Sequence, residues 1–313
     1  MVESKHKWKA WLYLSPALIL LAVFTVYPII NTIRLAFLED YSMMKAINGA
    51  TFEFGFGNFT KVVEYRNFLT CLKNTVLLCV LTVPLSTILA LLIAVVLNSI
   101  GPLRRVLQTI YFLPYVTNSI AIGMVFAAMF NMVGNVSANP PLITTAGIVN
   151  NFLGIFGIEP INWINVGSTY WANMTVMIIY IVWNALPFKI LILLGALQSV
   201  NKQYYDAAKV DGTSKFRTLM KITIPLLSPM IAYVVITGFM GGFKEYSSIV
   251  GIFGDTMGPP GNKGAMNTMV GFIYQSLEGQ HQGRASAAAL ILFAIIMAVT
   301  LINLQVSKKK VHY

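Results

Sequence analysis

Long apolar segments that carry almost no charge are the feature that most limits how this chain folds. Runs of about twenty mostly aliphatic residues recur along the 313 residues, and a helix of that length crosses the hydrocarbon core of a membrane. Hydrophobic residues make up 57% of the chain and charged residues 11%. The mean hydropathy is +0.70. A soluble protein of this size needs more charge on its surface. The sequence therefore predicts an all-α integral membrane protein.

Six such segments predict about six transmembrane helices. Charged residues, or clusters of Gly, Pro and Asn, separate one segment from the next. The predicted spans are residues 12–30, 74–97, 106–130, 168–197, 226–251 and 285–306. Pro84 and Pro187 lie inside the second and fourth spans, where kinks are expected. The predicted domain organisation is an amino-terminal tail, 1–10, followed by one transmembrane domain, 11–313.

Lysine and arginine predict which side of the membrane each segment faces. Six spans place both ends on one side, and cytoplasmic segments carry an excess of basic residues. With the ends in the cytoplasm, thirteen basic residues lie inside and six outside. The inner ones are Lys5, Lys7, Lys9, Arg104, Arg105, Lys202, Lys209, Lys215, Arg217, Lys221, Lys308, Lys309 and Lys310. The outer ones are Arg34, Lys45, Lys61, Arg66, Lys263 and Arg284. We therefore expect residues 201–225 in the cytoplasm.

Several chemistries are not expected of this chain. The net charge of +11 follows the membrane topology rather than a basic, aromatic surface for nucleic acid. Cys71 and Cys79 lack the spacing of metal ligands, and the three histidines are scattered. The glycines between 258 and 264 do not form a GxxxxGK[ST] phosphate-binding loop. We expect no metal or cofactor bound by this chain, and no enzymatic activity of the chain by itself.

The stretch 201–225 is the one long charged, amphipathic passage between two apolar segments. Its pattern predicts two short helices broken at Gly212, with Asp206 early in the first, where a carboxylate suits the positive end of a helix. The second helix is expected to end at Pro225. Its apolar face consists of Phe216, Leu219, Met220 and Thr223. The stretch fits either a helix pair lying at the lipid interface or an element that docks on a cytoplasmic partner.

The same stretch resembles the EAA loop of the membrane subunits of binding-protein-dependent ABC importers. The matching residues are Asp206-Ala207-Ala208, then Gly212, then Ile222-Thr223-Ile224-Pro225. Asp206 replaces the usual Glu and Ile224 the usual Leu. Other segments are similar to the sugar-type subfamily, related to maltose and multi-sugar permeases. They are Leu14-Ser15-Pro16-Ala17 through Tyr27-Pro28, Gly57-Asn58-Phe59, Tyr111-Phe112-Leu113-Pro114 and Ile161-Asn162-Trp163.

The resemblance implies a type I ABC importer permease fold in a bacterial cell membrane. It implies three kinds of partner besides membrane lipid: a second, distinct permease subunit, two cytoplasmic ATPase subunits that hold ATP and Mg, and an extracytoplasmic solute-binding protein. Asp206 and Gly212 would sit in a groove of the ATPase. The coupling residues would be Asp206, Ala207, Ala208, Asp211, Gly212, Phe216, Ile222 and Pro225. The implied cargo is a carbohydrate, an oligosaccharide, with a polyol or glycerol phosphate as the alternative.

Aromatic and amide side chains inside the spans are candidates for the solute path. Tyr180, Trp183 and Asn184 share one face of the fourth span, and Tyr115 and Asn118 share one face of the third. An amide inside a bilayer is costly unless it faces a partner or a wet cavity. Alternatively, both amides bridge neighbouring helices.

Lys244 and Glu245 form an adjacent pair of opposite charges near the outer end of the fifth span. They fit an interhelical pair, a gate or a contact with the solute. An ion-coupled carrier would need intramembrane acids, of which only Glu245 qualifies. An intramembrane enzyme would need a Ser/His or His/Asp/Glu constellation, which the sequence does not contain near a span.

Overall fold

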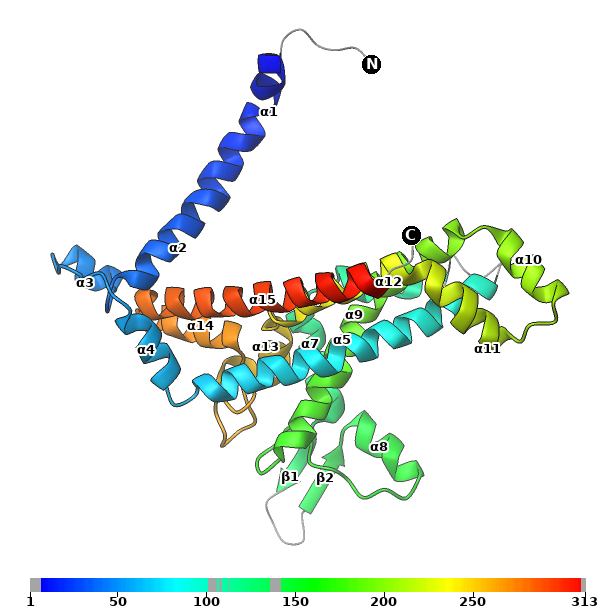
Figure 1. Ribbon diagram of the computed structural model, residues 1–313. Helices are drawn as coiled ribbons and strands as arrows, with labels where there is room; N and C mark the ends of the chain where they lie inside the picture. Colours follow the sequence, from blue (N-terminus) through cyan, green and yellow to red (C-terminus); the bar gives the residue numbers. More distant parts are fainter. Residues whose placement is uncertain (1–6, 101–105, 107–108, 112, 136–141, 311–313) are drawn as a thin grey trace. The chain divides into compact units, whose positions relative to one another are not determined.

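The structure is a computed structural model that describes residues 7–100, 106, 109–111, 113–135 and 142–310 (Figure 1). The chain divides into two compact units. The first unit comprises Met1–Phe68 and Phe272–Phe293, and the second comprises Leu69–Gly271 and Ala294–Tyr313. Helices α14 (Met269–Glu278) and α15 (Gln282–Lys310) each contain residues of both units.

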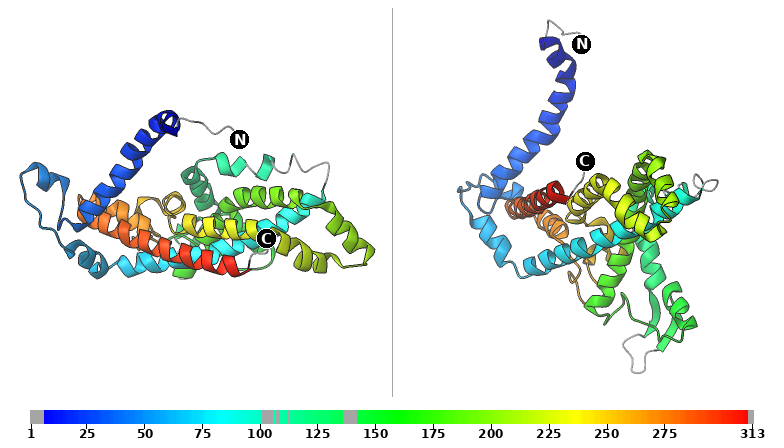
Figure 2. Two further views of the ribbon diagram at one scale, coloured as in Figure 1. Left: turned by 45° about the horizontal axis from the view of Figure 1, so that its top comes forward. Right: turned by 45° about the vertical axis from the view of Figure 1, so that its right-hand side comes forward.

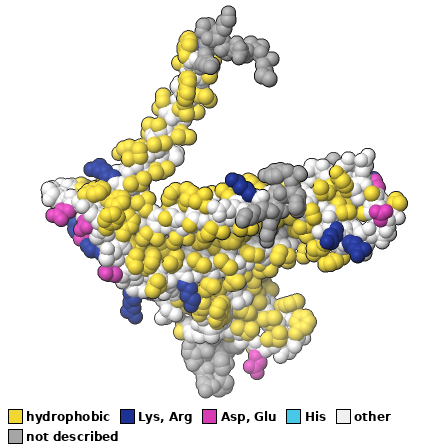
Figure 3. Space-filling view, in the orientation of Figure 1, with side chains coloured by type: hydrophobic (Ala, Val, Ile, Leu, Met, Phe, Trp, Pro, Cys, Tyr) yellow, Lys and Arg dark blue, Asp and Glu magenta, His cyan; other side chains and the backbone are white. Residues whose placement is uncertain are grey.

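Among the described residues, five helical runs are long and apolar enough to cross a membrane. They are Trp8–Phe37, Phe68–Ser99, Tyr170–Ser199, Lys215–Gly242 and Gln282–Lys308. A sixth apolar helix, Ser119–Phe130, is shorter. Hydrophobic side chains cover these helices in the space-filling view, while charged side chains gather at helix ends and loops (Figure 3). This distribution is that of a protein whose helices face lipid.

The first unit begins with one helical run of three parts: α1 (Lys7–Leu21), a π-helical turn η1 (Ala22–Val26) and α2 (Tyr27–Phe37). Short helices α3 (Met43–Ile47) and α4 (Gly57–Glu64) follow. Asn58, which is buried, fixes the chain here. Its amide donates to the carbonyls of Ala36 and Leu38 at 3.0 and 2.7 Å and accepts from the backbone N–H of Asp40 at 3.2 Å. A loop between two helices is thereby held by one side chain.

The second unit is built on three long helices that lie side by side: α5 (Phe68–Ser99), α9 (Tyr170–Ser199) and α12 (Ile224–Gly242) (Figures 1 and 2). Buried aliphatic residues from all three form one cluster, in which Ala90, Leu193 and Leu227 are central members. A second cluster packs α9 against α7 (Ser119–Phe130) and α13 (Ser247–Phe253). Burial of these apolar faces positions the polar side chains described below.

Two glycines let α7 and α13 approach closely. A Cβ atom placed on Gly123 would lie 2.6 Å from the Cα of Gly251, and one on Gly251 would lie 2.8 Å from the Cα of Gly123. Small residues at such a crossing bring backbones together, as is common between membrane helices. The fold therefore depends on the absence of a side chain at both positions.

The third and fifth predicted spans differ from the observed helices. The expected helix at 106–130 is interrupted by a 3-10 turn, η2 (Leu113–Val116), and α7 starts only after Asn118. Several residues of that expected span lie outside the described residues. The expected span at 226–251 ends at Gly242, and α13 is a separate helix. The second of these breaks, between α12 and α13, falls at the charged pair Lys244 and Glu245.

A small antiparallel sheet follows α7. Strand β1 (Met132–Asn135) pairs with β2 (Leu142–Ala146), with Met132 opposite Ala146. Helix α8 (Ile148–Ile155) follows, and the carbonyl of its buried Asn150 side chain accepts from the indole N–H of Trp163 at 2.9 Å. The sequence predicts helices alone. The two strands are short and lie outside the membrane-length helices.

Candidate functional site

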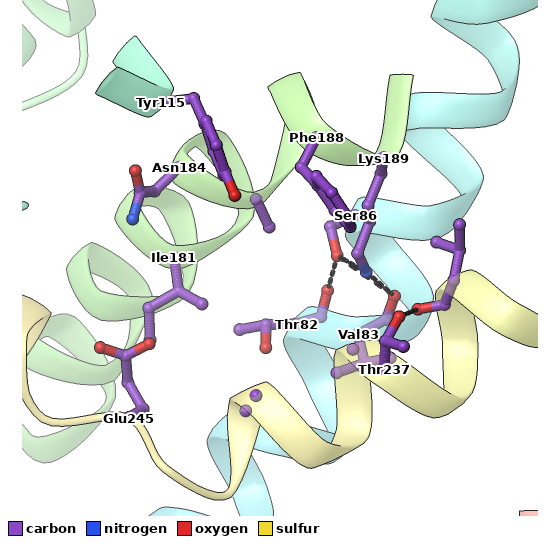
Figure 4. Close-up of a pocket in the computed structure, with 15 residues that line it drawn as sticks. Thr82, Val83, Ser86, Tyr115, Ile181, Asn184, Phe188, Lys189, Thr237 and Glu245 are labelled. Atoms are coloured by element: carbon purple, nitrogen blue, oxygen red, sulfur yellow. Dashed lines mark hydrogen bonds between the residues drawn. The ribbon is translucent and has the colours of Figure 1, made fainter. Parts of the chain in front are cut away.

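A cavity of about 290 Å³ lies in the second unit between α5, α9 and α12 (Figure 4). Three residues singled out from the sequence line it: Tyr115, Asn184 and Glu245. The Tyr115 ring stacks on Phe188, with ring centroids 5.8 Å apart and planes at 16°. The Glu245 carboxylate accepts from the backbone N–H of Ser248 at 3.2 Å. The cavity thus combines an aromatic face, an amide and a carboxylate.

Lys189, in the middle of α9, lines the same cavity and is only 5% exposed. Its ammonium group donates to the carbonyl of Val83 at 3.2 Å and to the Ser86 hydroxyl at 2.7 Å (Figure 4). It also donates to the Thr87 hydroxyl at 3.0 Å. An ammonium has three donors, and each has an oxygen here. A charge inside a membrane-length helix is stable only when it is satisfied in this way.

The neighbouring segments are shaped to receive this lysine. A Cβ atom on Gly238 of α12 would lie 3.3 Å from the Lys189 nitrogen, so glycine leaves room for the ammonium group. The Ser86 and Thr87 hydroxyls also donate to carbonyls of their own helix, those of Thr82 and Val83, at 2.5 and 2.7 Å. Lys189 is not among the residues predicted from the sequence to line the solute path. Its position in the interior of an apolar span is the signal that could have identified it.

Four other candidates for the solute path do not line this cavity. The buried Tyr180 donates its hydroxyl to the carbonyl of Ser119 at 2.6 Å, and its ring packs edge-on against Phe126. Trp183 packs against Phe126 as well. The Asn118 side chain caps α7 by accepting from the N–H groups of the two residues after Ser119. Lys244 is exposed. The structure therefore brings Tyr115, Asn184 and Glu245 together at this cavity, and the other four candidates lie outside its lining.

The predicted loop at 201–225 begins with helix α10 (Lys202–Val210), capped by the Asn201 side chain, which accepts from the backbone N–H of Gln203 at 3.0 Å. Gly212 follows with a φ of +65°, which glycine adopts without strain. Its N–H donates to the carbonyl of Lys209 at 3.1 Å, and that of Thr213 to the carbonyl of Ala208 at 2.9 Å. This pair of bonds is the Schellman motif at a helix carboxyl end. The break expected at Gly212 is present.

The second expected helix does not end at Pro225. Helix α11 (Lys215–Thr218), a π-helical turn η3 (Leu219–Thr223) and α12 form one continuous run. Pro225 sits in the first turn of α12, directly after the π turn. A π turn shifts the backbone pairing, and a proline at the start of a helix removes no needed donor. The expectation that Pro225 terminates the helix is therefore wrong. The same arrangement of a π turn and then proline occurs before Pro28.

Most of the proposed coupling residues are exposed. Exposed positions are Asp206, Ala207, Asp211, Gly212 and Phe216, whereas Ile222 and Pro225 are half-buried and Ala208 is buried. The most exposed large apolar side chains of the loop are Val210 at 88% and Phe216 at 68%. Asp206 forms an exposed ion pair with Lys209 at 3.5 Å, an interaction that contributes little to stability.

The long apolar helices and the polar cavity between them define a multi-pass membrane protein. Residues 82–312 match the family described as the binding-protein-dependent transport system inner membrane component. The match covers well over half of the chain, and the chain belongs to this family. The resemblance drawn from the loop motif is thereby confirmed.

Two relatives and one solved structure are similar to this chain over most of its length. It is 30% identical over 298 residues to the lactose transport system permease protein LacF of Rhizobium radiobacter, covering 94% of this chain and 91% of the relative. It is 28% identical over 303 residues to the arabinooligosaccharides transport system permease protein AraP of Halalkalibacterium halodurans, covering 96% and 88%. A chain of a bacterial alginate ABC transporter, in complex with an alginate pentasaccharide-bound periplasmic protein, matches with a TM-score of 0.76 and 22% identity over 97% of this chain and 96% of that one. The predicted importer permease fold is confirmed.

Proposed function

We propose that this chain is the permease subunit of an ATP-driven ABC importer that carries a carbohydrate, an oligosaccharide, across the bacterial cytoplasmic membrane. Family membership supports the importer class. The relatives named for lactose and arabinooligosaccharides, and the structural likeness to an alginate importer, support the carbohydrate. A second permease subunit completes the translocation path, and an extracytoplasmic binding protein delivers the solute.

The cavity that Tyr115 and Asn184 line is the observation that carries the carbohydrate assignment. A sugar presents hydroxyl groups at its edges and C–H groups on its faces. The stacked ring of Tyr115 suits those faces, and the amide of Asn184 and carboxylate of Glu245 suit the hydroxyls. Lys189 adds a fixed positive charge to the cavity wall, with its own donors held by α5.

The loop between α9 and α12 couples transport to the ATPase. Val210 and Phe216 are large apolar side chains that face solvent, and such exposure is typical of a surface that binds a partner. Asp206 and Gly212 lie beside them at exposed positions. ATP and Mg belong to the two ATPase subunits, and this chain supplies the path rather than the catalysis. Closure of the ATPase pair moves the loop. The helical run continues from the loop into α12 without a break, so α12 transmits this movement to the membrane-spanning part of the chain as a rigid element.

The cavity assignment is tested with two adjacent substitutions. Glu245→Gln removes a charge that lines the cavity, whereas Lys244→Gln removes one from the exposed neighbouring residue. The complex is reconstituted with its binding protein and ATP, and the initial rate of labelled-oligosaccharide uptake is measured. We expect Glu245→Gln to reduce the rate about tenfold, the effect of losing one charge-assisted hydrogen bond, and Lys244→Gln to leave it unchanged. Equal uptake rates for both variants and the wild type would show that Glu245 is not part of the solute path.

A further inference from the structure

A second, smaller cavity lies in the first unit, where α15 begins. Its volume is about 140 Å³, and a water molecule in the liquid occupies roughly 30 Å³, so a tetrahedral group of five heavy atoms fits. Its lining residues are Asp40, Tyr41, Asn58, Lys61, His281 and Arg284. Backbone bonds fix its walls: the N–H of Gly283 donates to the carbonyl of Tyr41 at 3.1 Å. The cavity is part of the fold of this unit.

Positive charge is in excess around this cavity. Lys61 and Arg284 line it, and the charge of Lys45 on α3 acts on both Asp40 and His281. Asp40 is the one carboxylate among the described lining residues, and Lys61 holds it at 2.5 Å. Burial, followed by the charges of Arg284 and Lys45, lowers the pKa of His281 below its ordinary value. Among these causes, the charges of Arg284 and Lys45 are the ones that disfavour another cation and favour an anion.

One hydrogen-bond donor of Arg284 has no partner among the described residues. Its guanidinium lies over the ring of Tyr65, 4.9 Å from the centroid. Its Nε is buried and has no hydrogen-bond partner among the described residues. A buried, unpartnered donor on a charged group is costly, and an oxyanion is the partner whose geometry matches the guanidinium fork. The first turn of the 29-residue helix α15 adds the positive end of its dipole at the same place.

The cavity lies at the level where two apolar helices end. The run Trp8–Phe37 ends three residues before Asp40, and the run Gln282–Lys308 begins directly after His281. Beside it, α3 exposes Met43, Met44 and Ile47 to solvent at 59–75%. Headgroups occupy this level of a bilayer, and exposed apolar side chains next to a basic cavity suit the acyl chains below a phosphate.

We propose that this cavity binds a phosphate oxyanion, and that its source is the headgroup of an anionic phospholipid held by Arg284 and Lys61. This site is separate from the solute path, because its residues lie in the first unit and the path lies in the second. The phosphate would neutralise the excess charge and give Arg284 its missing acceptor. It would thereby fix the start of α15 at the membrane surface.

The test uses the whole transporter complex and one matched pair of substitutions. Arg284→Gln removes the principal anion ligand, and Arg66→Gln removes an exposed arginine of the same unit that does not line the cavity. Each complex is equilibrated with an equimolar mixture of phosphatidylglycerol and phosphatidylcholine, and retained lipids are counted by native mass spectrometry. We expect the wild type and Arg66→Gln to retain phosphatidylglycerol selectively and Arg284→Gln to lose roughly tenfold or more in affinity. Lys61→Gln, at an exposed residue, gives a second variant if Arg284→Gln does not assemble.

A second arm separates the two sources of phosphate. Inorganic phosphate is compared with chloride at constant ionic strength, and the melting temperature of the wild type and of Arg284→Gln is followed. Suppose that inorganic phosphate stabilises the wild type but not Arg284→Gln, and that no phosphatidylglycerol is retained. The oxyanion site would then be supported, and the proposal that a lipid supplies the phosphate would be contradicted. Retention of phosphatidylglycerol that is equal in all variants, with no response to inorganic phosphate, would overturn the site itself.

Discussion

The ammonium group of Lys189 on α9 donates a 2.7 Å hydrogen bond to the Ser86 hydroxyl on α5. Two more oxygens of α5, those of Val83 and Thr87, complete its coordination. A positive charge in the wall of the candidate solute path is thus held entirely by neutral oxygens of one neighbouring helix. This contact fixes α9 against α5 in the middle of the membrane-length part of the chain.

Replacing Ser86 with alanine should destabilise the second unit. The substitution leaves Lys189 with two oxygen partners in place of three, and an unsatisfied buried donor costs about 1–3 kcal/mol. Ser99→Ala is the matched control, because Ser99 is on the same helix and its hydroxyl bonds only its own backbone at an exposed position. The melting temperature of the purified complex should fall for Ser86→Ala and stay within error for Ser99→Ala. Equal melting temperatures would show that the third hydrogen bond is not needed.

Replacing Gly123 with alanine should separate α7 from α13. The new methyl group would lie 2.6 Å from the Cα of Gly251, and a backbone atom cannot move aside as a flexible side chain can. Overpacking of this kind costs about 1–3 kcal/mol. Gly195→Ala, in α9, meets nothing within 4 Å and replaces a poor helix former with a good one. Thermal unfolding should show a loss of stability for the first variant and no loss for the second; the opposite order would contradict the close crossing.

Replacing Gly212 with valine should weaken the association with the ATPase subunits. The positive φ of Gly212 costs a residue with a side chain about 1–2 kcal/mol, and a β-branched residue more. Gly261→Val imposes comparable strain at a φ of +87° outside the loop. Co-purification of the ATPase should drop for Gly212→Val alone. If both variants retain the ATPase equally, the geometry of the loop end does not control docking.

His281 should make stability fall as the solution becomes acidic. Its pKa is below the ordinary value of 6.5, chiefly through burial and then through Arg284 and Lys45, with Asp40 opposing them. The unfolded chain therefore binds a proton at a higher pH than the folded chain, and folding loses stability as the pH drops below about 6.5. His281→Gln removes this contribution. Between pH 7.5 and 5 the melting temperature of the wild type should fall more than that of the variant, and parallel curves would contradict the shift.

Some of the fold was predictable because it depends on local chemistry. The apolar runs give the membrane helices from length and hydropathy alone. The end of α10 at Gly212 was predictable because a left-handed backbone position at a helix end calls for glycine. The continuation through Pro225 was not, because it depends on a π-helical turn, which is a rearrangement of backbone bonds that residue preferences do not encode.

The candidate solute path was likewise predictable only in part. Helical spacing correctly puts Asn184 near Tyr180, but four residues turn a helix by about 400°, so the two side chains point about 40° apart. That offset is enough to place Tyr180 in the core against Phe126 and Asn184 at the cavity. The sequence does not show which groups hold Lys189, because the oxygens come from α5, about a hundred residues earlier in the chain. Only the packing of the two helices brings them together.

ATP-dependent uptake by the reconstituted transporter tests the proposed function most directly. The complex of this chain with its permease partner, ATPase subunits and binding protein is placed in proteoliposomes, and uptake of a labelled oligosaccharide is followed with and without enclosed ATP and with an ionophore. We expect uptake that requires ATP and the binding protein and that the ionophore does not affect. Uptake that persists without ATP and stops when the ionophore is added would contradict the assignment as an ATP-driven importer.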